Sequence, residues 1–147
     1  MRRTLNEQVV AALLGGAGLL LAEIRFEHRQ VLGETRLAWI PLVYAGLLLL
    51  AGSLALWRWN AGGRRVLAAL FALAFVVGAL GLWFHLGGHP LSQLGRVAAA
   101  FLLEPGKDGG LKIGSQPPAL APGAFLGIGA LGLLACWKES RPASAME

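Results

Sequence analysis

The chain has 147 residues, of which 56% are apolar and only 14% are charged, and its mean hydropathy is +0.61. Soluble domains usually carry about a quarter charged residues, so this composition excludes an ordinary water-soluble fold. The formal charge of +5 comes from cations scattered along the chain. Since they form no contiguous basic helix and no recognisable nucleic-acid motif, we expect no nucleic acid among the partners.

The first apolar run, Val9 to Ala22, is short for a membrane span, which needs roughly 17 to 25 apolar residues. It reaches a usable length if its polar flanks lie at the two interfaces, and this predicts a helix over residues 5–27. Arg2 and Arg3 before the run also resemble the start of a secretory signal peptide. Leu20 stands where signal cleavage needs a small residue, so the pattern favours an uncleaved helix.

Three longer apolar runs follow, and each is long enough to cross a bilayer. They are predicted to be helices, because backbone polar groups in lipid must be satisfied within the segment. The expected ranges are 37–58, 64–86 and 120–138. The predicted fold class is therefore an all-α membrane protein, with four transmembrane helices in one domain over residues 1–147.

Aromatic residues flank the second predicted helix. Trp39 and Tyr44 lie near its start, and Trp57 and Trp59 lie near its end. Aromatic rings with a polar edge prefer the headgroup region. These residues are therefore predicted to mark the two membrane interfaces.

The connection between the third and fourth predicted helices, residues 87–119, is much longer than the others. Apolar residues after Pro90 fall at helical spacing: Leu91, Leu94, Val97, Ala98, Phe101 and Leu102. This spacing predicts a short amphipathic helix on the membrane surface or folded over the bundle. The residues after it are rich in glycine, proline and charge, which predicts an exposed loop.

Glycines are concentrated in the first and last predicted helices. Small residues three or four apart let helix backbones approach closely in lipid, and Gly123 with Gly127 forms one such pair. Their face is expected either to pack inside the bundle or to contact another membrane subunit or a second copy of the chain. The lipid bilayer is the other expected partner.

Lysines and arginines near the helix ends predict the orientation in the membrane. With the N-terminus inside, the cytoplasmic segments carry seven of them: Arg2, Arg3, Arg58, Arg64, Arg65, Lys138 and Arg141. The opposite segments carry six, which is nearly the same number. The tight turn RWNAGGRR, with three arginines, favours the orientation with both termini in the cytoplasm. We expect a multi-pass protein of a bacterial-type inner membrane, and the pattern resembles that of small bacterial integral membrane proteins.

All three histidines fall on the predicted outer side. His28 follows the first helix, while His85 and His89 end the third. Glu23 and Glu27 are four residues apart and so share a helix face. Imidazole and carboxylate are suitable ligands for zinc, copper or non-haem iron, and two histidines from separate helices can ligate a haem. These five residues are the candidate site for a metal ion or haem.

The same residues admit other interpretations. Gly87 and Gly88 interrupt the histidine pair, and Arg25 occupies the position three before His28 where a di-iron motif has glutamate. The charged residues around Glu23 can form salt bridges at a hydrated helix end. Alternatively, Glu23 is a half-buried acid that binds a proton, a quinone headgroup or a cation.

Missing motifs narrow the function further. Cys136 is the only cysteine, which excludes an internal disulfide and a dithiol redox pair. Helices two to four lack charged residues in their central turns, so transport by a monomer is not expected. We expect a non-catalytic accessory or assembly subunit of a larger membrane complex. A redox protein that binds metal or haem is the alternative, and an enzyme acting on lipid or quinone at the outer interface is a third hypothesis.

Overall fold

The computed structural model describes residues 3–27, 29, 31–86, 89 and 122–137. These ranges are helical and contain no strand, which confirms the all-α prediction. The long helices are α1 (Leu5–Glu27), α2 (Trp39–Trp57), α3 (Gly63–His85) and α5 (Gly123–Trp137). Short 3-10 turns at Val31–Gly33, Arg36–Ala38 and Trp59–Ala61 connect the first three. The amphipathic helix expected within 87–119 lies outside the described residues, which include only His89 of that segment.

Three of the helices have the length and composition of membrane spans. The apolar segments are Leu5–Phe26, Arg36–Trp57 and Gly63–His85. α5 is apolar but has 15 residues, about 22 Å at 1.5 Å per residue, against a hydrocarbon thickness of roughly 30 Å. The protein is thus a helical multi-pass membrane protein with three spanning-length helices and a shorter fourth.

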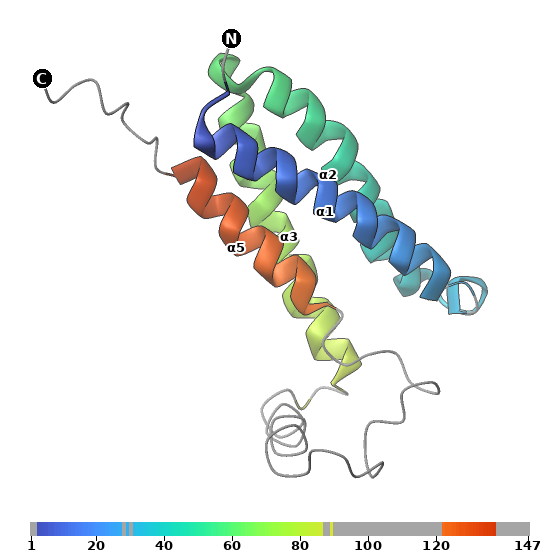
Figure 1. Cartoon of the computed structure of the whole chain (residues 1–147). Helices are drawn as coiled ribbons and strands as arrows, with labels where there is room; N and C mark the ends of the chain where they lie inside the picture. The colour runs from blue at the N-terminus through green and yellow to red at the C-terminus, as the bar shows by residue number, and fades with distance from the viewer. Residues whose placement is uncertain (1–2, 28, 30, 87–88, 90–121, 138–147) are drawn as a thin grey trace, which may run out of the picture.

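The four helices form a bundle in which sequential neighbours run antiparallel (Figure 1). α3 packs most extensively against α5, α1 packs against α2 and α5, and α2 also packs against α3. α1 and α3 therefore lie diagonally across the bundle. The start of α1, the end of α2, the start of α3 and the end of α5 lie together at one end (Figure 1).

The start of α1 is defined by a capping box. The backbone N–H of Thr4 donates to Glu7 Oε2 at 2.6 Å, and the backbone N–H of Glu7 donates to Thr4 Oγ1 at 3.3 Å. This reciprocal pair satisfies donors that the first turn of a helix leaves without an intrahelical partner. Both residues belong to the polar flank that the sequence places at an interface.

The turn between α2 and α3 needs two glycines for different reasons. Gly62 has a φ of +91°, in the left-handed region that disfavours a side chain. A Cβ atom at Gly63 would overlap the carbonyl oxygen of Ala55. This tight turn keeps Arg58 and Arg64 at the same end of the bundle.

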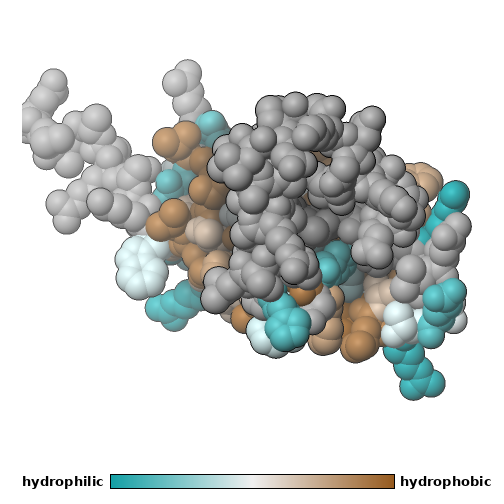
Figure 2. Space-filling view, turned by 90° about the horizontal axis from the view of Figure 1, so that it is seen from below, coloured by the Kyte–Doolittle hydropathy of each residue, from teal (hydrophilic) through white to brown (hydrophobic). Residues whose placement is uncertain are grey.

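The interior and the exterior of the bundle are both apolar. Phe71, Leu48, Leu67 and Val10 are the largest fully buried side chains. Large apolar side chains also cover the outer surface, and Leu50 is 76% exposed. Figure 2 shows such hydrophobic side chains on the flanks and hydrophilic ones at the right edge, where Figure 1 places the connection between α1 and α2. An apolar exterior of this kind is expected of helices surrounded by lipid.

Candidate functional site

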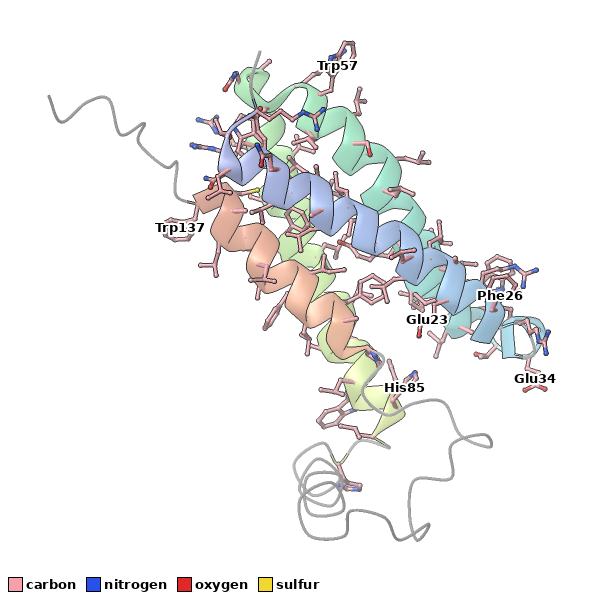
Figure 3. All side chains as sticks on the ribbon, in the orientation of Figure 1. Glu23, Phe26, Glu34, Trp57, His85 and Trp137 are labelled. Carbon is pink, nitrogen blue, oxygen red and sulfur yellow. The ribbon has the colours of Figure 1, made fainter. Side chains whose placement is uncertain are left out.

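The predicted site residues lie at one end of the bundle, which we call the histidine end: the ends of α1 and α3 and the start of α2. Glu23 is in the last turns of α1, His85 is the last residue of α3, and His89 follows it. Figure 3 shows Glu23 and His85 at this end and Trp57 at the opposite one. These three residues therefore lie at the same end of the bundle.

The three residues are not brought together as a metal site. Within the described part of the chain, no three histidine, cysteine or acidic side chains are close enough to hold a metal ion. Glu23 and His85 are carried by helices that lie diagonally across the bundle. His28 and the side chain of Glu27 lie outside the described residues. The complete five-residue site therefore stays a prediction.

Glu23 differs from the half-buried acid that one interpretation expects. Its side chain is exposed on the surface of α1, whereas the next residue, Ile24, is buried. His85 is partly buried, and its Nδ1 atom is buried. A carboxylate in the position of Glu23 is available to headgroups or water, so the acid is not held inside the protein.

Two of the aromatic residues predicted to mark the interfaces are packed into the core of the bundle. Tyr44 and Trp59 are buried, whereas Trp39 and Trp57 are exposed. The hydroxyl of Tyr44 donates to the carbonyl oxygen of Leu70 at 2.5 Å. Its ring meets Phe125 edge to face, with centroids 5.7 Å apart. A buried tyrosine needs a partner for its hydroxyl, and Tyr44 finds it on α3. Through its hydroxyl and its ring, Tyr44 thus joins α2 to both α3 and α5.

The charged residues are distributed unequally between the two ends. The end opposite the histidine end carries Arg3, Arg58, Arg64 and Arg65, and we call it the arginine-rich end. With Glu7, its described residues have a formal charge of +3. At the histidine end, the charged side chains that the structure describes have a formal charge of +1: Arg25, Arg29, Arg36, Glu23 and Glu34. Among the described side chains, net positive charge is therefore larger at the arginine-rich end.

Sequence reasoning missed a groove between α1 and α2 at the arginine-rich end. Its volume is about 300 Å³, and it is lined by Arg3, Ala11, Leu14, Gly15, Leu49, Ser53, Leu56 and Trp57. The adjacent glycines of α1 are the signal in the sequence, because a Cβ atom at Gly15 or Gly16 would meet no heavy atom within 4 Å. The sequence shows that α1 has small residues at these positions, but it does not show that the space between them and α2 is open.

The chain was compared with protein-family models, curated proteins and solved structures, and none of them matches it. Function therefore has to be argued from the described residues themselves.

Proposed function

We propose that the protein is a four-span membrane protein that serves as a non-catalytic accessory or assembly subunit of a larger membrane complex. α5 is the fourth span in this proposal. The termini face the cytoplasm of a bacterial-type inner membrane, because the arginine-rich end, where α1 starts, follows the rule that cytoplasmic segments are enriched in Lys and Arg.

The observation that carries the proposal is that α5 has small residues on two opposite faces. Gly129 and Gly132 are buried against α3. On the other face, a Cβ atom at Gly123 or Gly127 would meet no heavy atom within 4 Å. Gly127 is exposed and Gly123 is half-buried, which supports the expectation that this face contacts another subunit or a second copy of the chain.

The outer face of α5 carries small residues in its first half, whereas the exposed side chains of Leu131 and Leu134 follow toward its end. Exposed Ala124 and Ala130 extend the small-residue surface around Gly127. Helix association in membranes depends on small residues that let backbones approach, since lipid tails are as apolar as the side chains. The second glycine face is thus available to a helix of another subunit.

Purification in mild detergent followed by native mass measurement tests the proposal. We expect a complex with another membrane chain, and Gly127→Leu should dissociate it because the side chain projects from the outer face of α5. Gly46→Leu is the matched control, since a Cβ atom there also meets nothing within 4 Å but lies on α2. A lone monomer in wild-type preparations would contradict the proposal.

A redox protein that binds metal or haem is the second candidate, favoured by the placement of Glu23, His85 and His89 at one end. Metal analysis and a visible absorption spectrum of the purified protein test it. We expect stoichiometric metal or a Soret band that His85→Ala removes. Sub-stoichiometric metal together with a featureless spectrum would exclude this candidate.

A further inference from the structure

The groove between α1 and α2 extends from the arginine-rich end to about half-way along the two helices. Gly15 lies ten residues after Leu5, where α1 begins, which is about 15 Å along the helix. On α2, Leu49 lies eight residues before Trp57, the last residue of the helix, which is about 12 Å. Half of a hydrocarbon core of roughly 30 Å is about 15 Å, so the groove has the length of one leaflet.

The lining of the groove is suited to a hydrocarbon chain. Ala11, Leu14, Leu49 and Leu56 are apolar, and Gly15 leaves open space because no heavy atom lies within 4 Å of a Cβ built there. The hydroxyl of Ser53 donates a hydrogen bond of 2.6 Å to the carbonyl oxygen of Leu49 in the same helix. The one hydroxyl in the lining thus has a backbone partner, and the inner part of the groove requires no polar group from an occupant.

The mouth of the groove is basic. Arg3 lines it and is exposed, and Arg58 is exposed one residue beyond Trp57. These side chains lie at the end with a formal charge of +3 among the described residues. A cation at headgroup level attracts the phosphate of an anionic lipid.

We propose that this groove binds one acyl chain of an anionic phospholipid from the leaflet at the arginine-rich end, with the lipid phosphate against Arg3. The cationic mouth matches the lipid phosphate, the apolar lining matches the acyl chain, and the depth of one leaflet matches the length of that chain. A helix from another protein fits less well, because a helix with its side chains is about 10 Å wide and the groove holds only about 300 Å³.

Native mass spectrometry of the purified full chain, with phosphatidylglycerol or phosphatidylcholine added in equal amounts, tests the proposal. We expect one retained lipid, with phosphatidylglycerol preferred about fivefold through Arg3. Arg3→Gln should abolish that preference, whereas Arg65→Gln, which removes an exposed arginine of the same end outside the groove, should preserve it.

Gly15→Leu tests the apolar part of the site. The leucine side chain should fill the groove and remove the retained lipid of either headgroup, while Gly46→Leu on α2 should retain it. Equal retention of phosphatidylglycerol by wild type and Gly15→Leu, in folded protein by circular dichroism, would overturn the proposal. So would equal binding of the two lipids to the wild type.

Photo-cross-linking of the unmodified chain gives a test that does not depend on a variant folding. Phosphatidylglycerol with a diazirine in its acyl chain is reconstituted with the protein, and the labelled peptides are mapped. We expect labelling to concentrate on the α1 and α2 segments that line the groove. Labelling spread evenly over α2, α3 and α5 would show only surrounding bilayer lipid and overturn the proposal.

Discussion

Glycine has different effects at the contact between α3 and α5 and beside the groove between α1 and α2. Between α3 and α5, a Cβ atom at Gly129 would lie 2.7 Å from the backbone nitrogen of Phe75, and one at Gly132 would enter the ring of Phe71. On the α1 side of the α1–α2 pair, a Cβ atom at Gly15 would meet nothing within 4 Å. Gly129 therefore brings α5 into contact with the backbone of α3, whereas Gly15 leaves open space beside α1.

The largest expected effect is at the tight pair, with Gly129→Ala. The added methyl group meets the backbone of α3 at Phe71 and Phe75, which cannot move aside as a flexible side chain can. We expect a loss of about 3 kcal/mol in the free energy of unfolding, at the upper end of typical overpacking costs. Reversible unfolding by SDS in mixed micelles measures it.

Gly127→Ala is the matched control for that prediction. Gly127 lies on the same helix but faces outward with no heavy atom within 4 Å of a Cβ. Its stability should equal or slightly exceed that of the wild type, because alanine has the higher helix propensity. Equal losses from the two substitutions would mean that the close contact of α3 with α5 does not set stability.

Thr4→Ala tests how far α1 depends on its own cap rather than on tight packing. The substitution removes the oxygen that accepts from the Glu7 backbone N–H and should lower the free energy of unfolding by about 1 kcal/mol. The SDS titration gives this value, and helicity by circular dichroism should fall only slightly. Thr4→Ser keeps the acceptor and should behave as wild type. An equal loss in Thr4→Ser would show that the cap is not the cause.

The helix ranges could be predicted from sequence more closely than the contacts between helices. The expected ranges 5–27, 37–58, 64–86 and 120–138 end within three residues of α1, α2, α3 and α5, because the apolar runs have to match the thickness of a bilayer. The runs are apolar all round, however, and so do not indicate which face is inside. This is why Tyr44 was predicted at an interface although it is buried.

The candidate site was predictable only in part, for a related reason. Alternation of the helices places Glu23, His85 and His89 at one end, and topology alone gives that result. Whether their side chains converge depends on which helices are neighbours, and α1 and α3 are not close neighbours. The groove was missed because a pair of glycines in a helix is compatible either with close packing of a neighbouring helix or with open space beside the helix.

Tyr44→Phe tests the link between the looser and the tighter pair of helices. Phenylalanine keeps the ring against Phe125 but removes the hydroxyl that donates to Leu70. Hydrogen bonds between transmembrane helices contribute about 0.6 kcal/mol on average, so a loss of that size is expected in the same unfolding assay. Tyr44→Leu also removes the ring contact and should cost more. If Tyr44→Phe lost as much unfolding free energy as Tyr44→Leu, most of the contribution of Tyr44 to stability would come from its hydroxyl.

The smallest expected effect is at Gly15, and its sign is opposite to that at Gly129. Gly15→Ala adds a methyl group that meets no neighbour, while alanine restricts the unfolded chain and favours the helix, so unfolding should require about 0.5 kcal/mol more. The same unfolding titration, run beside Gly129→Ala, measures the difference in sign. If Gly15→Ala instead destabilises the protein, Gly15 faces a packed neighbour and the space beside α1 is closed. A gain would show that the sign of a glycine-to-alanine substitution distinguishes Gly15 from Gly129, since only at Gly129 does another backbone lie against the added methyl group.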